Sequence, residues 1–223
     1  METIKLTTWQ AVSDYIDAGA FQIRMSQFEH LQQHANYYPR HAYSKGQLAS
    51  KSWLLGELKR IDFAEDITVA ILGSWIGTLV DPLHQMMSIA RVYGIDADPE
   101  CVTISEKLNQ EYLEGWRYKG VCADVTQLDC SNMQFETGGE LIDVTPHIVI
   151  NTSSEHMNTE WFDTVSKQQL IVMQTNNSTE FDGHVNVCSS IEHMQELYPL
   201  SYTAYVGEMQ TPAYTRYMQI GFK

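Results

Sequence analysis

The sequence predicts an α/β fold: a doubly wound, mostly parallel seven-stranded sheet with a C-terminal antiparallel edge strand pair and a helical N-terminal extension. After residue 66, short apolar runs rich in β-branched residues alternate with helical segments, which is typical of parallel strands buried on both faces. The last two runs alternate apolar and polar residues with period two, as in an antiparallel pair. The chain has 223 residues, of which 43% are hydrophobic, and this is enough to bury one large core.

The N-terminal extension is expected to cover residues 1–66 and to be helical. An amphipathic stretch opens at Thr8, which is a suitable cap, and a second covers residues 25–36. In a third, residues 47–61, apolar side chains recur at three- and four-residue spacing. We see no linker between this extension and residues 67–223.

The predicted sheet begins after the extension. Its strands are expected at Ile67–Leu72, 91–95, 120–123, 147–150 and 170–173, with the closing pair at 201–206 and 214–220. Helices are expected between them at residues 76–90, 99–112 and 159–166. Pro99 at the first turn and Asp98 at the cap match the preferred chemistry of a helix start.

The charge of the chain argues against a protein that coats nucleic acid. Fourteen Lys and Arg residues stand against 28 Asp and Glu residues, so the net charge is −14 and the average surface field repels polyanions. The densest basic cluster comprises Arg40, Lys45, Lys51, Lys59 and Arg60. It is interpreted either as a solvated face or, through Lys45 or Lys51, as a site for a carboxylate or phosphate.

Cysteine usage and hydropathy favour a cytoplasmic protein with reduced thiols. The four cysteines form no C-x-x-C pair, and the N-terminus has no signal-like pattern. No apolar run approaches the roughly 18 residues of a membrane span, so no membrane partner is expected.

Glycine and polar residues follow four of the predicted strands. They stand at Gly73 to Gly77, Asp96, Asp124 and Asn151. Because ligands of open α/β sheets bind at the carboxyl ends of the strands, these residues are expected to form one site. The two oxygens of Asp96 can accept both hydroxyls of a ribose, which favours a nucleoside ligand.

At these positions the chain resembles the class I S-adenosylmethionine-dependent methyltransferases. The resemblance depends on four motifs between residues 67 and 157: VAILGSWIG, YGIDADPE, CADVTQLD and HIVINTSSEHM. It implies a Rossmann-like methyltransferase domain over residues 67–223 with S-adenosylmethionine as cofactor. The cofactor-binding residues it implies are Gly73, Ser74, Trp75, Gly77, Asp96, Ala97, Asp124, Val125 and Asn151.

Two substitutions depart from the family pattern. Ile71 stands where an acidic residue is usual, which leaves the cofactor's amino group without its usual partner, and Trp75 replaces a glycine. Trp75 is interpreted either as core or as a cation–π contact for the sulfonium.

The alternative interpretation of these residues is a nicotinamide-dinucleotide site, since Asp96 follows Gly77 by 19 residues. However, the loop lacks the G-x-G-x-x-G pattern that binds a pyrophosphate.

Methyl transfer requires positioning, exclusion of water and, for a hydroxyl or protonated amine, a base. His156 is the first candidate for that base because imidazole titrates near neutral pH, and Glu155 and His184 are the other catalytic candidates. No H-x-x-x-H or H-E-x-x-H pair is present in residues 67–223, which hold the candidate site, so no metal is expected there.

The acceptor is expected to be a small molecule or a peptide. Asn151-Thr-Ser-Ser departs from the Asn/Asp-Pro-Pro-aromatic run of methyltransferases that act on exocyclic amines, and the net charge disfavours DNA. An RNA acceptor, a different transfer on the same fold and an inactive binding subunit stay open as alternatives. The sequence predicts no oligomeric state.

Overall fold

The computed structural model describes residues 4–6, 42, 44–63, 66–137, 139–211 and 213–223. The helices expected from Thr8 and over 25–36 lie outside the described residues. None of the described helices is long and apolar enough to cross a membrane.

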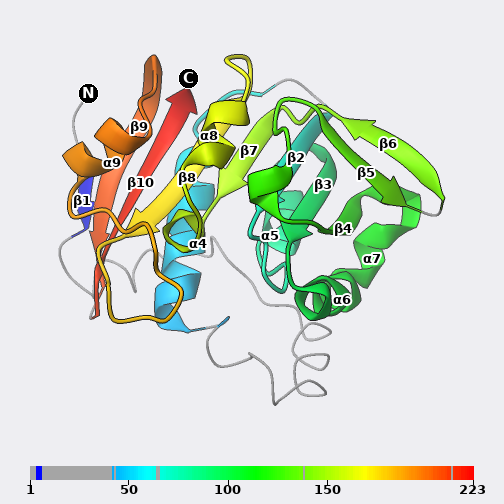
Figure 1. The fold of residues 1–223 in the computed structure, drawn as a ribbon, viewed down its shortest axis with the longest axis horizontal. Coiled ribbons are helices and arrows are strands. Elements are labelled where there is room, and N and C mark those ends of the chain that lie inside the picture. The colour runs from blue at the N-terminus through cyan, green and yellow to red at the C-terminus, as the bar shows by residue number, and fades with distance from the viewer. Residues whose placement is uncertain (1–3, 7–41, 43, 64–65, 138, 212) are drawn as a thin grey trace.

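An eight-stranded sheet forms the centre of the described part, in the order β1-β9-β10-β8-β7-β2-β3-β4 (Figure 1). The strands are β1 Ile4–Leu6, β2 Ile67–Leu72, β3 Ile89–Asp96, β4 Tyr118–Cys122, β7 Ile148–Asn151, β8 Leu170–Asn176, β9 Tyr202–Gln210 and β10 Thr215–Phe222. All neighbouring pairs are parallel except those made by β10, which is antiparallel to both β8 and β9.

This arrangement confirms the predicted fold class. The predicted seven strands are present, and β1 adds an eighth that pairs with β9. The predicted closing pair also forms. It does not end the sheet, because β1 forms the edge beyond β9, and β10 lies between β8 and β9.

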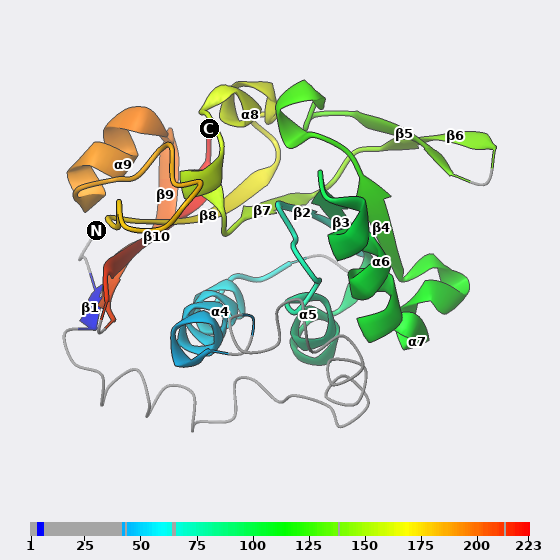
Figure 2. The same cartoon turned by 60° about the horizontal axis from the view of Figure 1, so that its bottom comes forward.

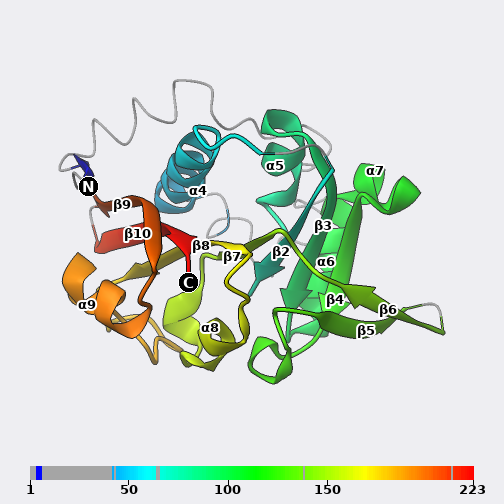
Figure 3. The same cartoon turned by 90° about the horizontal axis from the view of Figure 1, so that it is seen from above.

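Two layers of helices cover the sheet (Figures 2 and 3). The helices are α4 Lys45–Leu58, α5 Val80–Met86, α6 Pro99–Leu108, α7 Gln110–Leu113, α8 Glu160–Thr164 and α9 Ile191–Leu197. Helices α4 and α5 lie on one face, and α8 and α9 lie on the other. Both faces of a central strand are therefore buried, as the apolar runs predicted.

Strand β2 shows how the sequence pattern divides the core. Its side chains alternate between the faces, so Val69 and Ile71 belong to the hydrophobic cluster on the α4 and α5 side. Ala70 and Leu72 belong to the cluster that includes residues of α8 and α9. One continuous apolar run thus supplies both cores.

Helix α6 starts as predicted. The side chain of Asp98 accepts a hydrogen bond from the backbone N–H of Glu100 at 2.8 Å, and Pro99 occupies the first turn. Helix α5 is shorter than the predicted 76–90, because a tight turn through Gly77 delays its start and Ile89 already belongs to β3.

The described part of the N-terminal extension is packed into the main core. Trp53 of α4 belongs to the same cluster as β2, and its Nε1 donates to the hydroxyl of Tyr205 at 2.9 Å. Ser50 Oγ donates to Gln174 Oε1 at 2.6 Å, and Gln174 Nε2 donates to the Ser50 carbonyl at 3.0 Å. Helix α4 is thereby fixed to the sheet, whereas the division of the chain at residue 66 stays a prediction.

Besides β1, three features were not predicted from the sequence. Strands β5 Met133–Thr137 and β6 Glu140–Val144 form a separate antiparallel hairpin, and α9 precedes β9 (Figure 1). Three single-turn 3-10 helices, η2 Glu114–Trp116, η3 Val125–Gln127 and η4 Ser154–His156, occupy connections. The last two follow the ends of β4 and β7, where the predicted site lies.

Candidate functional site

A cavity of about 780 Å³ opens at the carboxyl ends of β2, β3 and β7. Its volume is in the range of small-molecule sites, roughly 300–1,000 Å³. Ten of the residues expected to be functional line it: Lys51, Gly73, Ser74, Trp75, Asp96, Ala97, Asp124, Val125, Glu155 and His156. Four others, Lys45, Gly77, Asn151 and His184, are not among its lining residues.

The turn after β2 brings two loops together. Gly73 has a φ of +60°, and a Cβ there would lie 3.1 Å from Ser153 Cβ and 3.2 Å from Met157 Cε. Ser153 Oγ also donates to the Gly73 carbonyl at 3.2 Å. The absence of a side chain at Gly73 therefore lets the β2 loop approach the loop that follows β7.

Gly77 does not line the cavity but lets the turn after β2 pack closely against the end of α6. Its φ is +71°, and a Cβ there would lie 2.8 Å from Asn109 Nδ2 and 2.9 Å from Ser105 Cβ. The backbone of the turn thus rests directly on the end of α6. This is the close helix approach that the third glycine of dinucleotide loops also permits.

Trp75 lines the cavity and also takes part in hydrophobic packing, whereas its contact with a sulfonium stays a prediction. It adopts a φ of +52°, which is uncommon for a residue with a side chain. The ring lines the cavity and also packs against a small cluster that includes Ile76 and Ile104. Its backbone N–H donates to Asp96 Oδ2 at 2.7 Å, so the turn is tied to the end of β3.

Asp96 is held by backbone hydrogen bonds on both of its oxygens. Oδ2 accepts from Trp75, and Oδ1 accepts from the N–H of Asp98 at 3.0 Å. A carboxylate oxygen has two lone pairs, so each oxygen can accept one more donor from a ligand in the cavity. The fixed orientation favours recognition of paired hydroxyls.

Asp124, after the end of β4, also accepts hydrogen bonds that fix the local backbone. Its Oδ1 accepts from the backbone N–H of Thr126 at 2.9 Å and from Thr126 Oγ1 at 2.8 Å, which caps η3. The cap fixes the path of the chain at Val125, which lines the cavity. In contrast, Asn151 is fully buried and turns the chain after β7, since its Oδ1 accepts from the N–H of Ser153 at 3.0 Å.

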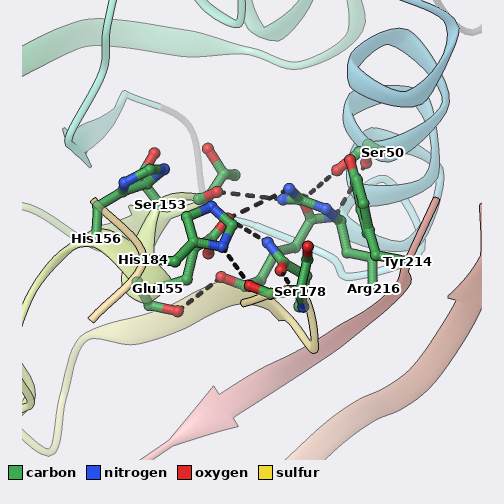
Figure 4. A network of polar contacts seen from close by, with 12 residues as sticks. Ser50, Ser153, Glu155, His156, Ser178, His184, Tyr214 and Arg216 are labelled. Carbon is green, nitrogen blue, oxygen red and sulfur yellow. Dashed lines mark hydrogen bonds and ion pairs between the residues drawn. The ribbon is translucent and has the colours of Figure 1, made fainter. Parts of the chain in front are cut away.

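Three buried charged residues lie at one end of the cavity: Lys51 from α4, Glu155 from η4 and Arg216 from β10. They are 7%, 2% and 3% exposed. An Arg216 Nη lies 3.4 Å from Glu155 Oε1, which also accepts from Asn176 Nδ2 at 2.7 Å (Figure 4). Two cations therefore accompany one carboxylate.

Lys51 is the more weakly compensated of the two cations. Its Nζ donates to Gln47 Oε1 at 2.6 Å. Burial, together with the nearby Arg216 guanidinium, lowers the pKa of Lys51 from its usual 10.5 to about 7. Lys45, the other basic residue singled out from the sequence, is exposed and does not line the cavity.

The two candidate histidines lie next to each other on the rim (Figure 4). The rings of His156 and His184 are 4.6 Å apart and nearly perpendicular. His156 Nδ1 lies 3.2 Å from the Gly183 carbonyl, and His184 Nδ1 lies 2.7 Å from the Ser178 carbonyl. His184 thus reaches the site by contact with His156 instead of lining the cavity itself.

Several lining residues were missed from the sequence, and Arg216 is the most important. It also donates from Nη1 to the Thr152 carbonyl at 3.2 Å. Arg216 is one of only three basic residues after Gly120, and it stands on an apolar strand. That isolated charge was the available signal, whereas nothing in the sequence separated Gln47 or Ser153 from ordinary polar residues.

Comparisons with known proteins identify the fold. No protein-family profile matches the chain, and no curated protein matches it in sequence. Among solved structures, magnesium protoporphyrin IX methyltransferase from Synechocystis PCC 6803 with bound SAH has a TM-score of 0.55 at 15% identity, covering 94% of this chain and 100% of that one.

Two further structures agree. A mutant of MtNAS in complex with S-adenosylmethionine has a TM-score of 0.51 at 14% identity, covering 96% of this chain and 79% of that one. A protein from Pyrococcus horikoshii OT3 has a TM-score of 0.58 at 13% identity, covering 86% of this chain and 99% of that one. Together with the strand order, these likenesses establish that the chain has the class I S-adenosylmethionine-dependent methyltransferase fold.

Proposed function

We propose that this protein is an S-adenosylmethionine-dependent methyltransferase that acts on a small-molecule or peptide acceptor. The observation that carries the proposal is the cavity that Gly73, Asp96 and Asp124 line at the ends of three strands of this sheet. The similar structures solved with SAH and with S-adenosylmethionine support the choice of cofactor.

The residues present fit that cofactor. Asp96 has lone pairs for the ribose hydroxyls, and Val125 and Asp124 line the region assigned to the adenine. Ser74 Oγ is buried without a hydrogen-bond partner among the described residues, and a polar ligand in the cavity would satisfy it. Ile71 lines the cavity where the family pattern has an acidic residue.

The buried cations are suited to bind the carboxylate in the methionine part of S-adenosylmethionine. Lys51 uses one of its three donors on Gln47, so two stay available for an anion. A carboxylate beside Lys51 would compensate a charge that burial disfavours. This contact from α4 would help to hold the methionine part of the cofactor, to whose amino group Ile71 offers no acidic partner.

The transfer itself needs little from the chain beyond position and a base. S-adenosylmethionine supplies an activated methyl group: a lone pair of the acceptor bonds to the methyl carbon while the carbon–sulfur bond breaks and its electrons neutralise the sulfonium. His156 lines the cavity and is exposed at its rim. Its Nε2 would accept the proton that the acceptor loses, and the surrounding loops would exclude water.

Calorimetry with S-adenosylmethionine, SAH and NAD tests the proposal. SAH is expected to bind wild-type protein and to bind Asp96→Ala roughly 10- to 100-fold more weakly, because hydrogen bonds to a charged group contribute about 1.5–3 kcal/mol. The matched control is Asp98→Ala, since Asp98 caps α6 outside the cavity. SAH affinity is expected to be unchanged in that variant.

Other results would overturn the proposal. Binding of NAD without either sulfur ligand would indicate a dinucleotide enzyme, and absence of all binding would indicate a non-catalytic relative. With SAH binding established, mass spectrometry of acceptors incubated with S-adenosylmethionine separates methyl transfer from another transfer, because each adds a different mass.

A further inference from the structure

We propose that Glu155, His156 and His184 form a binding site for one divalent transition-metal ion at the rim of the cavity. The site consists of three side chains of this chain and does not depend on S-adenosylmethionine. Only the role of the metal, in engaging the acceptor, rests on the proposed methyl transfer.

Two loops bring the three side chains together. Glu155 and His156 belong to η4 after β7, and His184 lies in the connection after β8, 28 residues further along the chain. One ligand atom from each lies within 4.8 Å of the other two. Small side-chain rotations would bring these atoms to the roughly 2.0–2.2 Å that metal–nitrogen and metal–oxygen bonds require.

The hydrogen bonds of both histidines fix the tautomer that a metal needs. Each Nδ1 faces a backbone carbonyl, of Gly183 for His156 and of Ser178 for His184. A carbonyl oxygen only accepts, so each Nδ1 carries the proton and each neutral ring keeps a lone pair on Nε2. Metal-binding histidines characteristically donate their other N–H to a carbonyl or carboxylate in this way.

Glu155 supplies an independent observation. Its Oε1 is bonded to Asn176 and Arg216, while its Oε2 is buried and has no hydrogen-bond partner among the described residues. A buried carboxylate oxygen without a partner is costly, and a cation would satisfy it. Asn176 and Arg216 would then orient the ligand through its other oxygen.

The donor set indicates the class of metal. Two imidazoles and one carboxylate favour Zn²⁺ or a similar ion such as Co²⁺, Fe²⁺ or Mn²⁺, whereas Mg²⁺ and Ca²⁺ favour oxygen ligands. Three protein ligands leave coordination positions open, as in catalytic sites. Because Glu155 and His156 line the cavity, an open position would be available to an oxygen of the acceptor.

This arrangement changes the part assigned to His156. As a ligand it would no longer serve as the base, and the metal would activate the acceptor by lowering the pKa of its bound oxygen. The sequence predicted no metal, since residues 67–223 contain no two histidines at the spacing of one helical turn. Here the ligands come from two loops that the parallel pairing of β7 with β8 brings together.

Metal binding is tested on the full chain after treatment with a chelator. Titration with Co²⁺ is expected to give visible absorption bands that saturate at one equivalent, and Zn²⁺ is expected to abolish them by displacement. His184→Asn should weaken Co²⁺ affinity at least 10-fold. His193→Asn is the matched control, because His193 is a partly exposed histidine outside the cluster.

The outcomes separate this inference from the proposed function. Binding of SAH without saturable Co²⁺ or Zn²⁺ binding would overturn the metal site and leave the cofactor proposal intact. Equal Co²⁺ affinity in wild type, His184→Asn and His193→Asn would also overturn it. Saturable metal binding that only His184→Asn weakens, with no SAH binding, would support the metal site and overturn the proposed function.

Discussion

The charge of Lys51 depends strongly on the fold. Its side chain is buried near Arg216, and its pKa is about 7 in the folded chain against 10.5 ordinarily. Below pH 7 the folded state carries the buried charge at full cost. Between pH 7 and 10.5 the unfolded chain binds more protons than the folded one, so this group's contribution to stability improves as pH rises.

Replacing Lys51 should therefore stabilise the protein in a pH-dependent way. We expect Lys51→Met to raise the free energy of unfolding by about 1 kcal/mol or more at pH 6, because a buried charge is removed, and by much less at pH 9.5. Urea denaturation at the two pH values measures the difference. Lys45→Met, at an exposed position, is the control, and an equal gain at both pH values for Lys51→Met would contradict the lowered pKa.

Alanine substitutions at Gly77 and Gly115 distinguish the destabilisation caused by steric crowding from that caused by backbone strain. Both have a φ near +70°, but a Cβ at Gly77 meets Asn109 and Ser105 within 3 Å, whereas nothing lies within 4 Å of one at Gly115. We expect Gly115→Ala to destabilise by about 1 kcal/mol from strain alone and Gly77→Ala by about 2–4 kcal/mol. Equal losses in urea denaturation would show that the α6 contact is not tight.

At the scale of elements, helix α4 depends on one glutamine of β8. Gln174 satisfies both Ser50 Oγ and the Ser50 carbonyl. Gln174→Leu should destabilise by about 2–3 kcal/mol, because it leaves these two buried groups without that partner. Ser50→Ala, which removes only the hydroxyl, should destabilise by about 1 kcal/mol. A larger loss of stability for Ser50→Ala than for Gln174→Leu would show that Gln174 is not the main contact of Ser50.

The strands could be predicted from the sequence where nearly all of their residues are buried. Strands β2, β7 and β8 are buried along most or all of their length, so their apolar runs identify them. The β5–β6 hairpin was missed although its residues alternate between exposed and more buried positions, because each strand has only five residues and the pattern is correspondingly short. Helix α9, Ile191–Leu197, was missed because only Ile191 and Met194 of its seven residues are buried, so its apolar periodicity is weak.

The candidate site was predictable only where it follows strand ends. Asp96 is the last residue of β3, and Asp124 lies two residues after the end of β4. The topology of a parallel sheet therefore places them together. Arg216 is different, because its position beside Glu155 depends on β10 lying between β8 and β9. The sequence predicted an edge pair but not that insertion. The same holds for His184, which a long connection brings beside His156.

Across the whole molecule, the charge distribution favours small acceptors over polyanions. The chain carries a net charge of −14, while Lys51 and Arg216 are buried at the cavity. A small anionic group can reach these cations through the opening, whereas a polynucleotide also requires a continuous basic surface for its phosphates.

We therefore expect no measurable binding of a 20-nucleotide RNA at 150 mM KCl, followed by fluorescence anisotropy up to 10 µM protein. Lowering the salt to 50 mM should not rescue binding, because the net repulsion between two polyanions is less screened there. Micromolar or tighter binding with an affinity that falls steeply with salt would instead indicate phosphate contacts, and the RNA alternative would then replace the small-molecule or peptide acceptor.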